Sequence, residues 1–341
     1  MSDLKSDYNN INLGHGSGGV MTRELLDNII FKAFSNTFLD KKHDGAIIST
    51  QGAMAISTDS FVVSPIFFKG GDIGQLAVHG TVNDVAMCGA IPEYLSLSFI
   101  VEEGMDMKDF IKIVKSIKEA ADKSDVKIIT GDTKVVERGK GDKIFINTTG
   151  FGRVHPNANI SADLIRNGDK IIVSGPIAQH GMAIMSQREG LEFESNIESD
   201  STNLNFLVES MLDEFGKDIR LLRDPTRGGM ASVLCEIADD MKLGIRLREG
   251  DLPMNKQVAA ACEMLGLDPL FVASEGIFLA FVHPDSADDI LQLMNNHEKG
   301  GGAAIIGEVE SSHPGRVVME SRIGGKRMVT PLLGEQLPRI C

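Results

Sequence analysis

The alternation of strand-like and helix-like segments restricts the fold of this chain most, and it recurs on both sides of residue 156. Apolar residues from Phe110 to Ala121 follow helical spacing between the short apolar runs 94–101 and 126–130, which predicts an amphipathic helix between two strands. Such segments in both halves predict an α+β protein with helices layered on mixed sheets. Further strands are predicted at 46–49 and 54–63, joined as a hairpin at Gln51-Gly52, at 144–154 and 170–173, and near Ile245, Ile277 and Ile305; further helices are predicted at 23–34, 75–87, 203–215, 229–241, 255–265 and 286–295.

Two domains are expected, because the chain of 341 residues exceeds the roughly 100–200 residues of a typical domain. The best candidate boundary is the turn-forming stretch Pro156-Asn157-Ala158-Asn159. We therefore expect an N-terminal domain at 1–155, a C-terminal domain at 156–323 and a C-terminal segment at 324–341. The end of that segment is expected to be a mobile tail, as untethered termini usually are.

The charge of the chain argues against a nucleic-acid partner. Its formal net charge is −14 and its isoelectric point is near 5.0, whereas binding to a phosphate backbone depends on clustered Lys and Arg. The N-terminal residues lack the basic region and apolar run of a secretory signal, and no uncharged apolar stretch approaches roughly 18 residues. A cytoplasmic location without membrane contact is therefore expected.

The cysteines do not form a metal-binding or disulfide pattern. Cys88, Cys235, Cys262 and Cys341 are widely spaced, and no C-x-x-C pair occurs. The first three lie in apolar or helical surroundings and are expected to be small buried hydrophobic residues. Cys341 differs from them because it is the last residue of the sequence.

Four aspartates, Asp59, Asp84, Asp132 and Asp224, lie beside predicted turns or helix starts. Carboxylates are hard oxygen ligands, which suit Mg²⁺ bound together with nucleotide phosphates. For any one of these residues alone, capping a helix or a turn is the better explanation. The motifs around them favour the metal-binding interpretation.

Two stretches are suited to binding an anion. Asp224-Pro225-Thr226-Arg227-Gly228-Gly229 precedes the helix predicted at 229–241, so the helix N-terminus and Arg227 could both face a phosphate. In the loop from Gly14 to Gly19, backbone amides could form a concave nest around anionic oxygens, although a flexible surface loop is the alternative. No convincing strand precedes the G-x-G-x-x-G pattern of this loop, and no P-loop sequence occurs, so any ATP would be bound by an uncommon type of fold.

Lys134 and Glu275 are candidates for proton transfer. Lys134 lies two residues after Asp132 and could meet a phosphate or move a proton, while Glu275 could act as a general base. For each residue alone, a surface salt bridge is an equally good interpretation.

Several motifs together resemble the HypE family of hydrogenase maturation factors, and the resemblance spans nearly the whole chain. The interior motifs are shared in weaker form by a wider superfamily that includes aminoimidazole ribonucleotide synthetase, selenophosphate synthetase and thiamine monophosphate kinase, whereas the terminal Pro-Arg-Ile-Cys is particular to the HypE family. The motifs are His15-Gly16-Ser17-Gly18-Gly19, Ser57-Thr58-Asp59-Ser60, Gly71-Asp72-Ile73-Gly74, Asn83-Asp84-Val85-Ala86, Thr130-Gly131-Asp132-Thr133-Lys134-Val135-Val136, Asp224-Pro225-Thr226-Arg227-Gly228-Gly229 and Pro338-Arg339-Ile340-Cys341.

The resemblance implies a two-domain PurM-like ATP-binding fold, in which the N-terminal sheet pairs across a homodimer and the C-terminal domain closes over ATP. It also implies a reaction on Cys341. A HypF-like carbamoyltransferase places a carbamoyl group on the thiol, and ATP-dependent dehydration converts that group to a thiocyanate. The cyanide then passes to iron on a HypC–HypD-like complex and becomes a ligand in the [NiFe]-hydrogenase centre.

The resemblance further implies roles for individual residues. Cys341 carries the reacting group, Lys134 stabilises the developing phosphate and Glu275 removes a proton from nitrogen. The implied ATP-binding residues are Gly16, Ser17, Gly18, Gly19, Asp59, Asp84, Asp132, Thr133 and Arg227, and the implied Mg²⁺ ligands are Asp59, Asp84, Asp132 and Asp224.

Two other functions remain open at this point. One is an ATP-dependent phosphotransferase or synthetase of the same superfamily that acts on a free small molecule, with Cys341 incidental. Selenophosphate synthetase itself is disfavoured. Chains that resemble it have a reactive cysteine or selenocysteine near the N-terminus, whereas here no cysteine precedes Cys88. The other is a non-catalytic scaffold whose tail docks onto assembly partners.

Overall fold

The computed structural model describes residues 4–17, 20–41, 46–190, 197–331, 337 and 339–341. In the first half of the chain, four strands form one sheet: β1 (Met54–Phe61), β4 (Ala90–Glu102), β5 (Lys127–Val136) and β6 (Ile144–Val154). Their order is β1-β6-β4-β5, with β4 and β5 parallel and the other neighbours antiparallel. β1 and β5 are therefore the two edges of this sheet.

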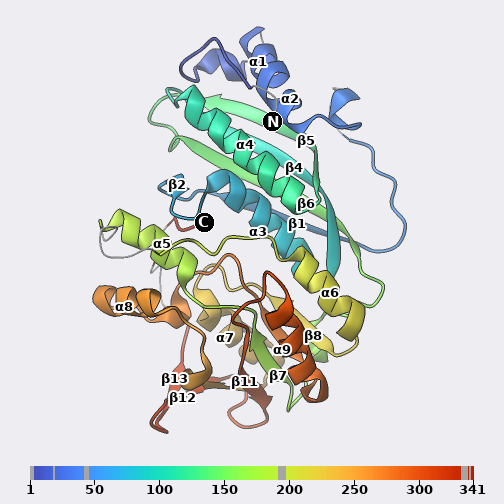
Figure 1. Cartoon of the computed structure of the whole chain (residues 1–341), viewed down its shortest axis with the longest axis vertical. Coiled ribbons are helices and arrows are strands. Elements are labelled where there is room, and N and C mark those ends of the chain that lie inside the picture. Colours follow the sequence, from blue (N-terminus) through green and yellow to red (C-terminus); the bar gives the residue numbers. More distant parts are fainter. Residues whose placement is uncertain (1–3, 18–19, 42–45, 191–196, 332–336, 338) are drawn as a thin grey trace.

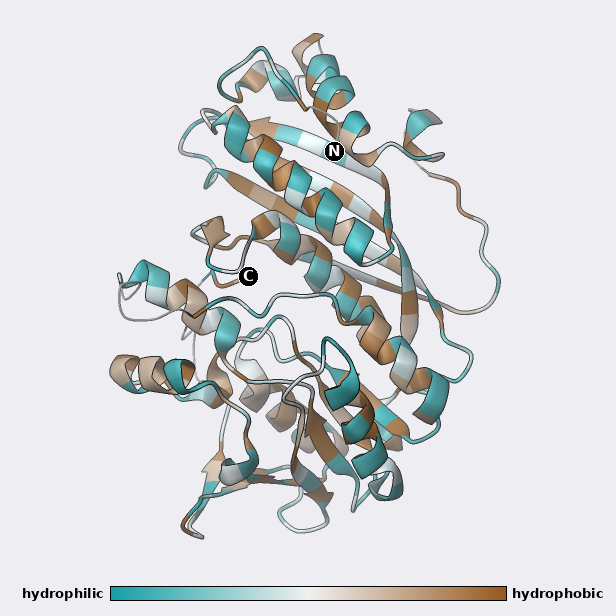
Figure 2. Ribbon diagram, viewed as in Figure 1, coloured by the Kyte–Doolittle hydropathy of each residue, from teal (hydrophilic) through white to brown (hydrophobic). Residues whose placement is uncertain are grey.

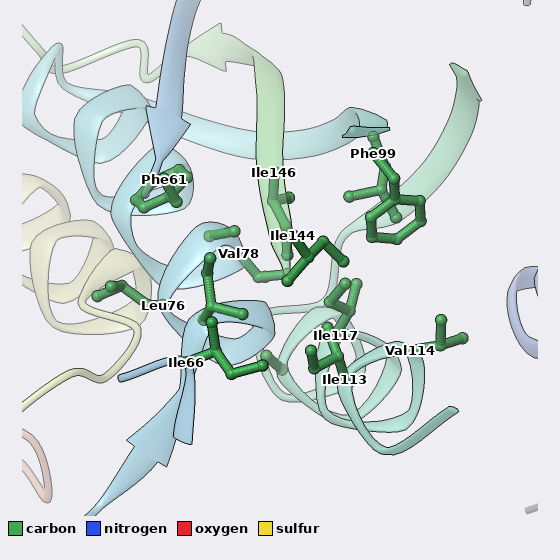
Figure 3. Close-up of a cluster of buried hydrophobic side chains, with 14 of the residues drawn as sticks. Phe61, Ile66, Leu76, Val78, Phe99, Ile113, Val114, Ile117, Ile144 and Ile146 are labelled. Carbon is green, nitrogen blue, oxygen red and sulfur yellow. The ribbon is translucent and has the colours of Figure 1, made fainter. Parts of the chain in front are cut away.

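Helices α3 (Ile73–Met87) and α4 (Met107–Lys123) lie over one face of the sheet (Figure 1). The residues of α4 that were predicted to form its apolar face are buried, and hydrophobic and hydrophilic positions alternate along its ribbon (Figure 2). Side chains from α4, α3 and the strands meet in a common core (Figure 3). Within this core, Phe99 packs edge to face on Phe110. The predicted amphipathic helix between two strands is confirmed.

The second half is built on a larger mixed sheet. Its strands are β7 (Lys170–Val173), β8 (Ile219–Arg223), β9 (Gly244–Arg248), β10 (Leu279–Val282), β11 (Ala304–Glu310), β12 (Val317–Glu320) and β13 (Lys326–Val329). They are arranged in the order β13-β12-β9-β11-β7-β10-β8. The helices of this half are α5 (Gln179–Arg188), α6 (Asn205–Phe215), α7 (Gly229–Met241), α8 (Lys256–Leu265) and α9 (Ala287–Asn296).

Short elements connect these layers. Before β1 the chain forms η1 (Leu13–Gly16), α1 (Val20–Leu25), a π-helical turn η2 (Leu26–Ile30), α2 (Phe31–Phe34) and η3 (Leu39–Lys41). The remaining short elements are β2 (Phe67–Phe68), β3 (Gly71–Asp72), η4 (Ala162–Leu164), η6 (Glu249–Asp251), η7 (Pro269–Phe271) and η8 (Pro284–Ser286).

α3 lies between the two halves and is buried on nearly every side. The N-terminal sheet packs on one side of it, and α6 and β8 contact it from the second half. Asp72 begins the helix by accepting hydrogen bonds from the backbone N–H groups of Gly74 (2.8 Å) and Gln75 (3.0 Å), which is a standard N-cap arrangement. A helix that is apolar all round needs cover on all sides, so α3 becomes the shared core of both halves.

Asn83, which is buried on α3, fastens the second half to this helix. Its amide nitrogen donates to the backbone oxygens of Thr202 (2.9 Å) and Glu275 (3.3 Å), and its amide oxygen accepts from the backbone N–H of Leu204 (2.8 Å). One side chain thereby satisfies three backbone groups from two separate segments.

The predicted hairpin at Gln51-Gly52 is wrong. Residues 46–50 form no strand, and β1 pairs instead with β6, about ninety positions further along the chain. The predicted strand at 126–130 continues to Val136, so Asp132 lies inside β5 rather than after its end. Turn residues between two apolar runs predict a hairpin from local sequence. The sequence around β1 contains no signal that it pairs with a strand so far along the chain.

Other predictions met mixed outcomes. The helices predicted at 75–87, 203–215, 229–241, 255–265 and 286–295 are confirmed within a few residues, whereas α5, β8, β12 and β13 were not predicted. Cys235 and Cys262 are buried as expected, but Cys88 is exposed, because it follows the last turn of α3 at the edge of the packed layer. No helix within the described ranges has the length and apolar content needed to span a bilayer.

We predict that Asn83→Ala lowers the free energy of unfolding by about 2 kcal/mol or more, because it leaves buried backbone groups without partners. Urea denaturation followed by circular dichroism measures this loss. Asn296→Ala, at an exposed position on α9, is the matched control and should change stability by less than about 0.5 kcal/mol. Equal effects of the two substitutions would contradict the fastening role of Asn83.

Candidate functional site

A cavity of about 480 Å³ lies between the end of β1, the N-terminus of α7 and the end of the chain. Asp59 and Ser60 line it from β1, and Arg227 lines it from the turn before α7. Ile340 and Cys341 line it from the chain terminus. The cavity therefore brings together three of the segments that the sequence singled out.

The turn before α7 depends on two glycines. Gly228 and Gly229 have φ angles of 73° and 62°, in the left-handed region that side chains other than glycine rarely adopt. A Cβ atom added to Gly229 would lie 2.6 Å from the backbone oxygen of Leu270, which leaves no room for any larger residue. The turn places the N-terminus of α7 next to the exposed side chain of Arg227. This combination suits an anion such as a phosphate.

Three of the four predicted metal-binding aspartates lie close to this cavity. Asp84, on α3, accepts a hydrogen bond of 2.7 Å from Ser57 Oγ. Burial raises the pKa of Asp84, the Ser57 hydrogen bond lowers it and the Asp59 charge raises it. Burial, and then the Asp84 charge, raise the pKa of Asp224 to about 7. These shifts show that the three carboxyl groups are near enough to repel one another.

The carboxyl groups are not yet arranged as a closed metal site. Across the residues that the structure describes, no three His, Cys, Asp or Glu side chains converge tightly enough to hold a metal ion. The chemistry of the donors nevertheless fits a hard cation, because carboxylate oxygens that repel one another are brought together by positive charge.

Glu275 is buried beside this cluster. Its Oε1 atom has no hydrogen-bond partner among the described residues. Burial, and then the Asp224 charge, raise the pKa of Glu275 well above its usual range, which favours the protonated form of the side chain. Its backbone N–H donates to Asp200 Oδ1 at 3.1 Å, which fixes the position of the residue in the site.

Cys341 lies against Glu275 inside the site. Burial raises the pKa of the Cys341 thiol far above its ordinary value, the Glu275 and Asp59 carboxyl groups raise it further, and Arg227 acts in the opposite direction. The sulphur is therefore a neutral thiol in this position and a poor nucleophile. A group attached to this sulphur would lie beside a carboxyl group that can exchange protons with it.

The chain terminus is docked rather than free. Ile340 is only 4% exposed, and the backbone oxygen of Cys341 accepts a hydrogen bond of 3.2 Å from Val62 N–H. The predicted mobile tail is thus held in the cavity at its last residues. An isolated sequence gives no signal for this docking, because the partner surface is formed by residues more than 150 positions away.

The glycine loop and β5 form a second cavity of about 390 Å³. Gly16 and Ser17 line it together with Asp132, Thr133 and Lys134. Lys134 Nζ lies 3.3 Å from Asp132 Oδ2, and both side chains are largely exposed. Gly18 and Gly19, also predicted to bind ATP, lie outside the described residues.

The two cavities lie at opposite edges of the N-terminal sheet. Asp59 on β1 and Gly131 on β5 lie in the same row across the sheet, with β6 and β4 between them. Three strand spacings of ~4.8 Å separate the two residues by about 14 Å. Asp132, one residue further on, points to the opposite face of the sheet from Asp59. The predicted single site is therefore not assembled within one chain, and Asp132 does not join Asp84 and Asp224.

The family model "AIR synthase related protein, N-terminal domain" matches residues 42–154, and "AIR synthase related protein, C-terminal domain" matches residues 166–320. Carbamoyl dehydratase HypE of Rhizobium leguminosarum bv. viciae is 50% identical over 332 residues, which cover 97% of this chain and 95% of that protein. Carbamoyl dehydratase HypE of Escherichia coli strain K12 is 41% identical over 98% of this chain and 100% of its own length.

Solved structures give the same picture. A structure of the hydrogenase maturation protein HypE in complex with ATP has a TM-score of 0.93 and 46% identity, and covers 96% of this chain and 99% of that chain. A HypE–HypF complex has a TM-score of 0.80 and 45% identity, covering 92% of this chain and 100% of that chain. The predicted two-domain PurM-like fold and the resemblance stated from the motifs are both confirmed. This chain therefore belongs to the HypE family of AIR synthase related proteins.

Proposed function

We propose that this chain is an ATP-dependent carbamoyl dehydratase that acts on a carbamoyl group carried by its own Cys341, in the maturation of [NiFe]-hydrogenases. Relatives that are 50% identical over nearly the whole chain bear the name carbamoyl dehydratase. The observation that carries the proposal is the position of the partly buried Cys341, whose thiol lies beside Glu275 in a cavity that is also lined by the turn at the N-terminus of α7.

The reaction removes the elements of water from the S-carbamoyl group. ATP transfers its terminal phosphoryl group to the carbamoyl oxygen, which makes that oxygen a good leaving group. The C–O bond then breaks with release of phosphate, nitrogen loses its two protons, and an S–C≡N group remains. The products are the thiocyanate, ADP and phosphate, and the oxygen of the carbamoyl group leaves in the phosphate.

The residues of the first cavity suit these steps. Arg227 and the N-terminus of α7 would hold the phosphate as negative charge develops on it. Glu275, once it has lost its own proton, would accept a proton from nitrogen, and its raised pKa makes it a stronger base than an ordinary carboxylate. Asp59, Asp84 and Asp224 would hold Mg²⁺, which when bound supplies positive charge to the phosphate oxygens.

A homodimer would complete the site. The face of the N-terminal sheet opposite α3 and α4 carries exposed apolar residues, including Ile56 (62% exposed) and Ile100 (45% exposed), and an open sheet face with such residues is typical of an interface. A two-fold axis along the strands would lay the β5 edge of one subunit over the β1 edge of the other. The partner subunit's Asp132 and Lys134 would then lie near Asp59.

The partner proteins are proposed from the family to which the chain belongs. A solved HypE–HypF complex supports a HypF-like carbamoyltransferase as the donor of the carbamoyl group, and we further propose a HypC–HypD-like complex as the acceptor of cyanide. The division into 1–155, 156–323 and 324–341 remains a prediction.

The first test is the intact mass of the protein after reaction with a HypF carbamoyltransferase, carbamoyl phosphate and ATP, and then with ATP and Mg²⁺. We expect a gain of one carbamoyl group followed by the loss of one water, with neither change in Cys341→Ala. No adduct on Cys341 would favour the small-molecule kinase or the scaffold instead, and an adduct that never loses water would contradict the dehydratase chemistry.

The crowding of carboxyl groups predicts a pH-dependent stability. The pKa of Asp224 is about 7 in the folded state and roughly 3.9 in the unfolded chain. The contribution of Asp224 to the free energy of unfolding is therefore fully present below about pH 4 and is lost as the pH rises to about 7. An asparagine side chain cannot ionise, so the Asp224→Asn variant does not lose stability as the pH rises. In EDTA, its free energy of unfolding should exceed that of the wild type by about 1–3 kcal/mol at pH 7.5 and should be close to that of the wild type at pH 4.5. Denaturant titrations at both pH values measure the difference, with Asp285→Asn, which is exposed, as control. An equal effect at both pH values would contradict the repulsion among Asp59, Asp84 and Asp224.

The shared site predicts complementation between two inactive variants. In a dimer of Lys134→Ala with Glu275→Ala, one of the two sites combines an intact lysine from one subunit with an intact glutamate from the other. Co-expression should therefore restore about one quarter of the wild-type dehydration rate after random pairing, measured by the same mass assay. Two copies of the same variant serve as the control, and no recovery in the mixture would place both residues in one subunit.

A further inference from the structure

The last residues of the chain are hydrogen-bonded to the segment that directly follows β1, beside the N-terminal sheet. The backbone N–H groups of Val62 and Ser64, just after β1, donate to the backbone oxygens of Cys341 (3.2 Å) and Arg339 (3.3 Å). Alternate residues of two antiparallel segments are thus joined by backbone hydrogen bonds, although neither segment is a regular strand. The terminus is recognised through its backbone on this side.

Helix α5 holds the same residues from the other side. His180 Nε2 lies 2.9 Å from the backbone oxygen of Ile340, and because a carbonyl oxygen can only accept, Nε2 must carry the hydrogen. His180 Nδ1 then accepts from Ser199 Oγ at 2.8 Å, and that hydroxyl oxygen accepts from the backbone N–H of Ser201 at 3.1 Å. The imidazole is fully buried, and burial lowers its pKa to about 4, so it is neutral and fixed in one tautomer.

Arg188 holds the chain from the last turn of α5. Its Nε atom donates to the backbone oxygen of Ser64 at 2.6 Å, and its Nη2 atom donates to the backbone oxygen of Arg339. The guanidinium group thereby joins the two segments that pair beside it. His180 and Arg188 together bind two successive carbonyl groups of the terminus.

The hydrogen bonds of this arrangement avoid the reacting atom. They end on backbone atoms of residues 339–341 and not on the Cys341 sulphur. The side chains beside the cysteine add to the fit: Ile340 is buried in the N-terminal core, and the Arg339 guanidinium pairs with Asp142 and donates to the backbone oxygen of Val62. Chemical change at the sulphur therefore leaves the hydrogen bonds intact.

We propose that His180 and Arg188 are positioning residues that form a latch on the backbone of the chain terminus and hold residue 341 beside Glu275 whatever group its sulphur carries. This proposal rests on the proposed function, because it assigns the latch to the reaction at Cys341. The latch acts by geometry alone, since neither side chain contacts the sulphur.

The test compares two substitutions of His180 that retain different nitrogen positions. His180→Gln can still reach the Ile340 oxygen with its amide N–H, whereas His180→Asn is shorter and can meet only Ser199. Alkylation by iodoacetamide is followed by peptide mass analysis of the full-length protein, with the exposed Cys88 as internal reference. We expect Cys341 to be alkylated about tenfold faster in His180→Asn, because a buried acceptor loses its donor, and within about twofold of wild type in His180→Gln.

Rescue by Gln separates positioning from a merely structural role. Equal acceleration in both variants, or no acceleration in His180→Asn, would overturn the latch. Because His180 is buried, Arg188→Met gives a second measurement at a partly exposed position; it should accelerate alkylation of Cys341 about fivefold, and an unchanged rate would also overturn the proposal. Thermal unfolding confirms that each variant is folded.

The alkylation assay uses unmodified protein, so it is independent of the carbamoyl chemistry. If the latch variants behave as expected but the mass assay finds no thiocyanate, the proposed function fails and the latch stands. If wild-type protein forms thiocyanate while alkylation is unaffected by His180→Asn and Arg188→Met, the latch fails and the proposed function stands. When both hold, His180→Asn should also slow single-turnover dehydration about tenfold, and His180→Gln should restore it.

Discussion

The burial of α3 is the constraint on which the rest of the structure depends. Most residues on every side of this helix are buried, and both halves of the chain are needed to enclose it. Its burial places two neighbouring polar residues in very different settings: Asn83 is used to attach the second half, and Asp84 is left facing the acidic cluster. The position of the candidate site therefore follows from packing, and the catalytic geometry is as rigid as the core that carries it.

The buried carboxyl groups of the candidate site lower the stability of the fold that contains them. Several carboxyl groups are removed from water and brought near one another, and burial together with the neighbouring carboxyl groups raises the pKa of Glu275 well above its usual range. Folded proteins tolerate such groups where function requires them, and the surrounding structure must supply the stability that they cost. Here that support comes from the two apolar cores to which α3 contributes side chains and from the hydrogen bonds across the junction. Positive charge arriving with a nucleotide would relieve the same repulsion.

Several local features could be predicted from the sequence, although the local helix α5 and the strands β12 and β13 were missed. The apolar face of α4, the strand β6 and the glycine turn before α7 each follow from spacing or from a short motif, and all were predicted. The pairing of β1 with β6 and the separation of Asp132 from Asp59 depend on residues about ninety and seventy positions apart, which no local pattern reveals. His180 was missed for the same reason. A single histidine in an apolar stretch has no motif around it, and its partner is the backbone of a residue 160 positions away.

The docked terminus also determines how the reaction depends on concentration. Because the cysteine belongs to the chain, its encounter with the cavity is intramolecular, and its effective concentration is set by the tether rather than by the amount of protein in solution. The candidate enzyme would therefore have no Michaelis constant for its own thiol, and saturation would be governed by the nucleotide alone. The hydrogen bonds beside β1 hold the terminus inside the cavity. Access of the thiol to the cavity would therefore depend on a conformational equilibrium between a terminus held inside and a terminus available to other proteins, and not on the concentration of protein.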